Sequence, residues 1–207
     1  RETNYYLDKD AKFVIENFSL GKPFTNFLPG IAGLWGIPMW VFYCNRGQGI
    51  SSFGIEGKDK AILEFLPANK AYRITPNQGF RTFLKIKSNA KDLFYEPFSN
   101  NLQNLNFQIN QKMFISPYDL TIEEENKTLG LITRVNYFTL SSEPFAALVR
   151  QVSIKNISNK RLSLELIDGL PVVVPYGLSD WLNKNMCRTI EAWFEVVNLE
   201  EKAPFYN

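Results

Sequence analysis

The sequence predicts an all-β protein, a large antiparallel β-sandwich with at most one or two short helices. Segments rich in aromatic and β-branched residues recur at intervals of about ten residues between positions 36 and 87. Turn residues such as Gly, Pro, Asn and Asp separate these segments, and no helical patterns alternate with them as a βαβ fold requires. Longer strand-like segments follow between positions 112 and 170. Even spacing of short strands favours a sandwich or barrel.

The first half of the chain is expected to form six strands. They cover residues 12–18, 36–45, 50–55, 61–66, 70–75 and 80–87. The expected turns are Arg46-Gly47-Gln48-Gly49, Gly57-Lys58-Asp59, Pro67, Pro76-Asn77 and Ser88-Asn89.

The second half is expected to contain four longer strands after a polar loop at residues 99–104. These strands cover residues 112–124, 129–140, 146–156 and 161–170, and residues 125–128 and 157–160 are hairpin turn candidates. Apolar and polar residues alternate along residues 146–156, as in a half-buried strand. Arg150 falls on the apolar face of this strand. A buried arginine needs a partner, so it is either paired within the fold or directed into a site.

Residues 180–195 form the one credible helix. Ser179 or Asp180 can cap its first turn, and the apolar positions approximate a helical stripe. The alternative is a loop followed by a strand at residues 188–199. A strand-like segment at residues 194–199 lies near the end of the sequence.

Length and composition favour one domain over two. The 207 residues, 45% hydrophobic and 21% charged, are enough to bury a substantial core. We expect a single β-sandwich domain over residues 1–207. We also expect it to be incomplete at its C-terminal end, with unpaired strands that favour a dimer or larger assembly.

Charge and cysteine content exclude several classes of partner. A net charge of +2 without a Lys/Arg cluster gives no reason to expect a nucleic acid. No apolar run approaches the length of a membrane span, and no signal-peptide pattern opens the chain, so we expect no membrane partner and a cytoplasmic location. Cys44 and Cys187 are far apart and form no metal or redox motif, so we expect both to be reduced and packed.

The chain contains no histidine. This absence removes Ser-His-Asp and Cys-His catalysis, His-ligated zinc and an imidazole general base. Carboxylate chemistry remains, but a glycosidase pair needs two acids at a defined separation, which sequence spacing cannot establish. We expect no catalytic residue, no metal ligand and no cofactor.

Residues 27–85 are rich in aromatic residues, glycine and uncharged polar residues. This composition suits a surface for a neutral, hydroxyl-rich ligand, because aromatic faces cover C–H patches while amides and arginine bond hydroxyls. The alternative is a set of strands whose aromatic side chains form core.

The best polar cluster in this region is Asn45, Arg46 and Gln48, on a turn after an aromatic strand. An arginine and two amides can grip hydroxyls or a carboxylate. The alternative is a turn whose amides bond nearby backbone groups. Trp35 and Trp181 are the further candidates for substrate binding.

Several segments resemble a known enzyme family. They are residues 26–65 (NFLPGIAGLWGIPMWVFYCNRGQGISSFGIEGKDKAILEF), 66–72 (LPANKAY), 78–83 (QGFRTF), 168–177 (DGLPVVVPYG) and 191–193 (EAW). Together they resemble the N-terminal region of glycoside phosphorylases of the cellobiose-phosphorylase family, glycoside hydrolase family 94. The likeness is greatest to the 1,2-β-oligoglucan phosphorylases.

The resemblance implies a super-β-sandwich of the galactose-mutarotase-like type, followed in family members by a helical linker, an (α/α)6 barrel and a C-terminal sheet domain. In such enzymes inverting phosphorolysis occurs in the barrel, where an Asp acid protonates the leaving sugar and inorganic phosphate, the co-substrate, attacks. Residues 1–207 include none of that barrel, so no catalytic residue carries over. The implied partners are an oligosaccharide, the remaining domains of the parent chain and a second copy.

The sequence therefore predicts a non-catalytic N-terminal sandwich of a phosphorylase that acts on β-linked gluco-oligosaccharides. It would serve as scaffold, dimer contact and possible donor of loops to the substrate. The first alternative is a free-standing carbohydrate-binding module. The second, a complete sugar-active enzyme such as an epimerase, is disfavoured by the lack of histidine.

Overall fold

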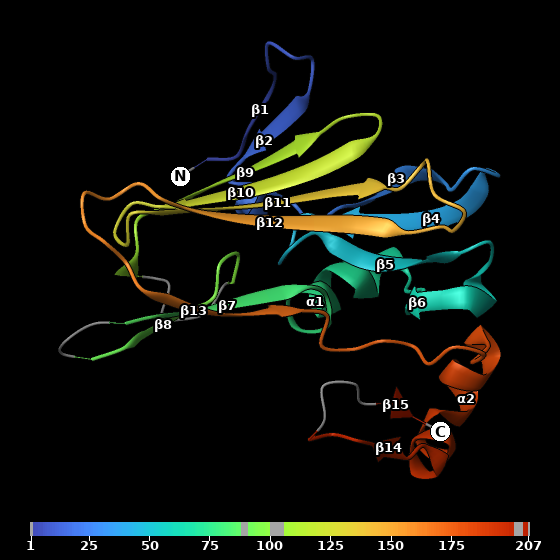
Figure 1. The fold of residues 1–207 in the computed structure, drawn as a ribbon. Coiled ribbons are helices and arrows are strands. Elements are labelled where there is room, and N and C mark those ends of the chain that lie inside the picture. Colours follow the sequence, from blue (N-terminus) through green and yellow to red (C-terminus); the bar gives the residue numbers. More distant parts are fainter. Residues whose placement is uncertain (1, 88–90, 100–105, 201–204, 207) are drawn as a thin grey trace.

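The computed structural model describes residues 2–87, 91–99, 106–200 and 205–206. Over these residues the protein is mostly β, with 42% strand, two α-helices and antiparallel sheets that include ones of six, four and three strands (Figure 1). This confirms the predicted all-β, antiparallel class. Neither helix in the described residues has the length and apolar character needed to cross a membrane.

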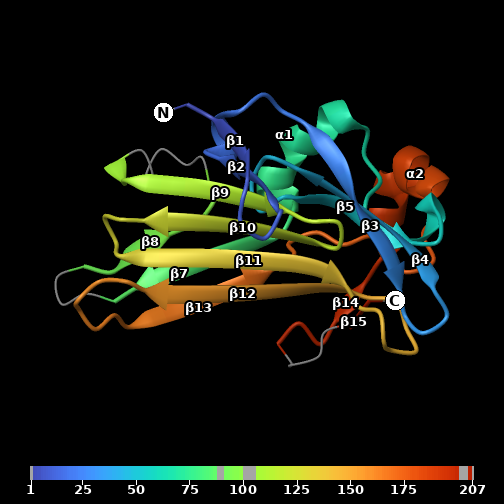
Figure 2. The ribbon, with the colours of Figure 1, turned by 90° about the horizontal axis from the view of Figure 1, so that it is seen from above.

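The six-stranded sheet forms one layer of the molecule (Figure 1). Its strands, in spatial order, are β1 (Asn4–Leu7), β2 (Phe13–Glu16), β9 (Ile109–Ile115), β10 (Asp119–Asn126), β11 (Leu131–Thr139) and β12 (Leu148–Asn156). Each neighbouring pair is antiparallel. Viewed from above in Figure 2, β9 to β12 lie in front, and neither helix covers them.

The three-stranded sheet lies below it, and the four-stranded sheet lies to one side, from the level of β11 and β12 downward (Figure 1). The four-stranded sheet contains β3 (Thr25–Ala32), β4 (Ile37–Cys44), β5 (Ile50–Ile55) and β6 (Ala61–Leu63) in that order. The three-stranded sheet has the order β13 (Leu164–Gly169), β7 (Arg81–Ile86) and β8 (Leu93–Tyr95). A short ribbon pairs β14 (Val196–Val197) with β15 (Phe205–Tyr206). The helices are α1 (Ala68–Gln78) and α2 (Asp180–Trp193), and single 3-10 turns occupy Phe18–Leu20 and Lys58–Lys60.

Two apolar clusters lie between the layers. The larger joins the six-stranded sheet to β3, β4 and β5 and includes the fully buried Val41, Ile50, Met113 and Val135. The smaller joins β11 to the three-stranded sheet through Leu84 and Leu131 and their neighbours. Period-two alternation places these side chains on the inner faces of their strands.

The predicted strand at residues 70–75 is wrong, because this segment belongs to helix α1. Ala71 and Thr75, four residues apart, are the buried positions, so the apolar spacing is helical rather than alternating. The Thr75 hydroxyl donates to the Ala71 carbonyl at 2.7 Å. The predicted turn at Pro76 instead lies in the last turn of α1, where Gly79 closes the helix by donating its N–H to the Thr75 carbonyl.

Two predicted connections also differ from the structure. Residues 112–124 are not one strand, because a turn after Ser116 separates β9 from β10. In this turn the Ser116 backbone N–H donates to the Asp119 carbonyl at 3.0 Å. The expected hairpin at residues 157–160 does not form, since β13 crosses to the lower layer and pairs with β7. There Leu164 joins the smaller apolar cluster. The predicted turn at Ser88-Asn89 and most of the loop at residues 99–104 lie outside the described residues.

The other expected strands and the helix at residues 180–195 are present with shifted ends. The Ser179 hydroxyl accepts the Leu182 N–H at 3.3 Å and caps α2 as predicted. Both cysteines are free thiols. Cys44 is buried, but Cys187 is exposed, so the expectation that it is packed was wrong.

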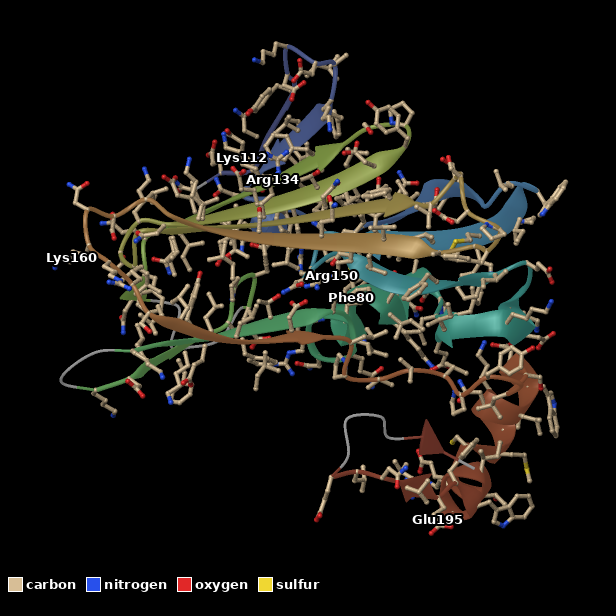
Figure 3. The ribbon with its side chains drawn as sticks, viewed as in Figure 1. Phe80, Lys112, Arg134, Arg150, Lys160 and Glu195 are labelled. Carbon is tan, nitrogen blue, oxygen red and sulfur yellow. The ribbon has the colours of Figure 1, made fainter. Side chains whose placement is uncertain are left out.

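Arg150 points from β12 into the space between the layers (Figure 3). Its guanidinium pairs with Asp168 of β13 through Nη1–Oδ2 at 2.5 Å and Nη2–Oδ1 at 2.9 Å. It also donates to the Gln48 Oε1 and Thr82 Oγ1 atoms at 2.5 and 3.1 Å. The guanidinium carbon lies 4.9 Å from the centre of the Phe80 ring. Of the two alternatives open from the sequence, the structure shows Arg150 paired within the fold.

A second buried polar centre lies on β10. The carboxylate of Glu124 accepts hydrogen bonds from the Tyr95 hydroxyl, the Gln111 amide at 2.6 Å and the Phe98 N–H at 2.8 Å. Burial raises the pKa of Glu124, and these three donors act in the opposite direction. Arg150 and Glu124 therefore each connect the six-stranded sheet to segments of the lower layer.

Replacing Arg150 tests how strongly the Arg150–Asp168 ion pair holds the layers together. We expect Arg150→Ala to lower the free energy of unfolding by about 3 kcal/mol, because the buried Gln48 and the partly exposed Asp168 both lose their charged partner. Lys155→Ala, on the exposed face of the same strand, should change it by less than about 0.5 kcal/mol. Urea unfolding followed by circular dichroism measures both, and equal stabilities would contradict the role given to Arg150.

The Arg150–Asp168 ion pair also predicts that the free energy of unfolding falls in acid. Burial alone would raise the pKa of Asp168, but hydrogen bonds from Arg150 and Thr82 leave this pKa below its ordinary value. A lowered pKa means that the stabilisation is complete above the unfolded pKa of about 3.9 and declines as pH falls below it. The stability difference between the wild type and Asp168→Asn should therefore be larger at about pH 7 than at about pH 3. A constant difference across urea titrations at both pH values would refute this.

Candidate functional site

The structure places Asn45 in the interior rather than on a ligand-facing surface. Asn45 is 1% exposed. Its amide donates to the carbonyls of Phe18 and Lys22 at 2.9 and 3.0 Å, and its Oδ1 accepts the Phe24 N–H at 3.0 Å. Asn45 thus ties the turn to the segment before β3, which is the alternative role that the sequence left open.

Arg46 and Gln48 complete the same turn and also bond to their own chain. Arg46 is half-buried, and its two terminal nitrogens donate to the carbonyls of Asn45 and Gly21 at 2.7 and 2.9 Å. Gln48 is buried, donates to Thr82 Oγ1 at 2.9 Å and accepts from Arg150. The structure therefore brings the three predicted residues together, inside the fold. Their binding of a ligand stays a prediction.

Gly47 shows how tightly this turn packs. Its φ of 53° lies in the left-handed region that favours glycine. An added Cβ would come within 2.9 Å of the Pro76 Cα in helix α1. The turn and α1 are therefore in direct backbone contact.

Trp35 and Trp181 are both exposed, at 82% and 62%. Trp35 lies in the turn between β3 and β4, and Trp181 lies in the first turn of α2. Tyr43 and Phe53 lie in the larger core cluster, as the alternative interpretation expected. Trp40, Phe42 and Phe65 are only partly buried, and their rings pack against one another with centres 5.5 to 6.2 Å apart.

The outward face of the six-stranded sheet, which neither helix covers, carries many charged, amide and hydroxyl side chains beside the apolar Phe114 and Ile132, and we call it the open face. It consists of the outward side chains of β2, β9, β10, β11 and β12. Figure 3 shows Lys112 and Arg134 on this side of the sheet, opposite to Arg150. Strand register aligns its side chains in rows that run across the strands.

The first row alternates in charge. Its members, in order across the sheet, are Glu16, Lys112, Glu123, Arg134 and Ser153. Lys112 Nζ pairs with Glu16 Oε1 at 2.9 Å, and this hydrogen bond lowers the pKa of Glu16 and raises that of Lys112. Glu123 and Arg134 make no ion pair within the described part of the chain.

The second row is uncharged. Its members are the buried Val14 and then Phe114, Thr121, Asn136 and Gln151. The Thr121 hydroxyl donates to the Asn136 Oδ1 at 2.9 Å. This bond uses the Asn136 oxygen and not its amide N–H groups, which are donors. The Arg134 guanidinium lies 5.8 Å from the centre of the Phe114 ring and so connects the two rows.

Two neighbouring hollows lie on the open face. One is lined by Thr121, Arg134, Asn136, Gln151 and Ser153 together with Asp119 and Val152. The other is lined by Glu16, Lys112, Glu123 and Glu125 and their neighbours. Because Glu123 and Arg134 are cross-strand partners, the hollows meet at this pair. Together they offer amides, a hydroxyl, a guanidinium and carboxylates, which are the groups that bond a hydroxyl-rich ligand.

The open face was not identified from the sequence. Alternation along each strand indicates which side chains share a face, but only the strand order shows that this face is uncovered. Within the described ranges no group of three or more Cys, Asp or Glu side chains could hold a metal ion. No family model matches the chain, and no curated protein matches it.

Asn45 gives a direct test of the structural role of the turn. We expect Asn45→Ala to lower the free energy of unfolding by about 2 kcal/mol, because three buried backbone groups lose their partner. Trp35→Ala serves as the control and should change it by less than about 0.5 kcal/mol, since this indole is exposed. Thermal unfolding of both variants decides the matter, and an unaffected Asn45→Ala protein would return the turn to the list of ligand sites.

Proposed function

We propose that this protein is a non-catalytic, carbohydrate-associated β-sandwich whose open face receives a gluco-oligosaccharide. The observation that carries the proposal is the pair of cross-strand rows on a sheet face that neither helix covers. Arg134 and Glu123 form no ion pair among the described residues, and the Asn136 and Gln151 amides are directed outward. Amides, hydroxyls and guanidinium groups match the alternating donors and acceptors of sugar hydroxyls.

The family resemblance gives the proposal its setting. We infer that the chain is the N-terminal part of a phosphorylase of the cellobiose-phosphorylase type, with a sandwich of the mutarotase-like class. Phosphorolysis would occur in a barrel domain outside residues 1–207, where inorganic phosphate is the co-substrate. The sandwich would act as scaffold and dimer contact and would guide the oligosaccharide.

Exposed apolar side chains support a scaffold role over that of a free-standing module. Phe83, Phe94 and Ile167 lie on the outer side of the three-stranded sheet, and all three are exposed. Tyr176 and Trp193 are exposed on the segments that follow. Phe83 and Ile167 are cross-strand partners and form an exposed apolar pair, which further domains of a parent chain would cover.

Calorimetric titration with sophorose and longer β-1,2-glucans tests the proposed ligand site. We expect Arg134→Ala to weaken binding about tenfold or more, because a hydrogen bond from a charged donor contributes about 1.5–3 kcal/mol. The matched control is Lys160→Ala, at a turn away from the open face (Figure 3), which should leave the affinity unchanged. Equal binding by both variants, or no binding by the wild type, would remove the open face as the site.

The absence of catalysis is tested separately. Incubation of the pure protein with β-1,2-glucans and inorganic phosphate should release no glucose 1-phosphate, since the chain has no histidine and the barrel implied by the resemblance is not among its residues. Phosphate-dependent turnover that copurifies with the protein through two chromatographic steps would overturn the non-catalytic assignment.

A further inference from the structure

A separate cavity of about 440 Å³ lies between the two helices, on the opposite side of the molecule from the open face. The C-terminal half of α1 and the strand β6 form one side. The segment at residues 172–178 forms a second side, and α2 with the following Phe194 and Val196 forms the third. Small-molecule sites in proteins typically have volumes of about 300–1,000 Å³.

Specific contacts outside the cavity hold its walls in place. The Val174 N–H donates to the Ile62 carbonyl at 2.8 Å and joins the 172–178 segment to β6. At the start of α2, Asp180 accepts Lys58 Nζ at 3.2 Å, and the Asp180 N–H donates to the Asp59 carboxylate at 2.9 Å. These contacts fix the segment and the helix while the space between them stays open.

The described residues that line the cavity are mainly apolar, and the charged ones among them are acidic. Its apolar side chains include Leu63, Ile74, Leu178 and Ile190. Among the described residues that line it, the ionisable side chains are two carboxylates, Glu64 and Glu191, and the thiol of Cys187, and none is lysine or arginine. An anionic ligand would meet these two carboxylates, whereas a hydroxyl or an ammonium group could bond to them.

We propose that this cavity binds a small, predominantly apolar molecule that carries a hydroxyl or an amino group. The apolar part fills the space among Ile74, Leu178 and Ile190. The polar group lies toward Glu64 or Glu191. This site is independent of the oligosaccharide site, because it shares no residue with the two hollows of the open face.

Cys187 provides a reporter within the cavity. It is the exposed thiol of the chain and lines the cavity, whereas Cys44 is buried in the core. A bound molecule should therefore slow alkylation of Cys187 by N-ethylmaleimide, an uncharged reagent. We expect octylamine and octanol to slow the reaction at least fivefold at saturation, and octanoate to have no effect at the same concentration.

Displacement of the neutral dye N-phenyl-1-naphthylamine gives an independent readout. Ile190→Trp, which places a larger side chain in the cavity, should abolish the part of the fluorescence that octylamine displaces. Trp193→Ala, at an exposed position on the same helix, should leave that part unchanged. The double variant Glu64→Gln with Glu191→Gln should lose the preference for octylamine over octanoate.

The proposal is overturned if Cys187 of the wild-type protein reacts equally fast with and without octylamine or octanol. It is also overturned if octanoate protects as well as the amine. Should Ile190→Trp fail to fold, as judged by circular dichroism, the alkylation experiment on the wild-type protein still decides the question.

Discussion

The arrangement of the layers depends on one guanidinium group. Arg150 projects from the edge strand of the six-stranded sheet into an apolar interior, where a charge without partners would be strongly unfavourable. Its partners come from three other places in the chain: Asp168 from β13, Thr82 from β7 and Gln48 from the turn before β5. The Tyr137 hydroxyl extends this network by donating to the Gln48 carbonyl at 2.8 Å. Because every bond has a defined direction, the network fixes how the lower sheets sit beneath the upper one.

This network also separates the core from the candidate site. The strands β10, β11 and β12 direct one set of side chains to the interior and the other set to the open face. Tyr137 and Arg150 point inward, while their neighbours Asn136 and Gln151 point outward and are cross-strand partners. A rigid inner face therefore holds the outer rows in register. Such preorganisation favours binding, since little side-chain and backbone order has to be gained when the ligand arrives.

Local patterns predicted most strands, because alternation and turn residues act within a few positions of one another. The same reasoning put Arg150 on an apolar face and required a partner for it. It could not identify Asp168, because the crossover of β13 to the lower layer is decided by packing of Leu164 and Leu84 rather than by the turn before it. The prediction of a strand at residues 70–75 was wrong for a related reason. Its buried positions four residues apart, Ala71 and Thr75, show a helix once the structure is known, and Pro76, which predicted a turn, lies inside that helix. The open face depends on strand order, which no single segment contains.

The position of Arg150 has a consequence for solubility. The strand β12 ends its sheet, so one side of its backbone has no neighbouring strand within that sheet. Exposed edges of this length recruit strands from other chains and start aggregation, and proteins counter this with charges that point inward from the edge. Arg150 and its partner Asp168 lie at this margin, and the Asp168 side chain still reaches solvent at 26% exposure. A foreign strand added along β12 would seal this ion pair from water. The group that joins the layers thereby also opposes uncontrolled growth of the sheet.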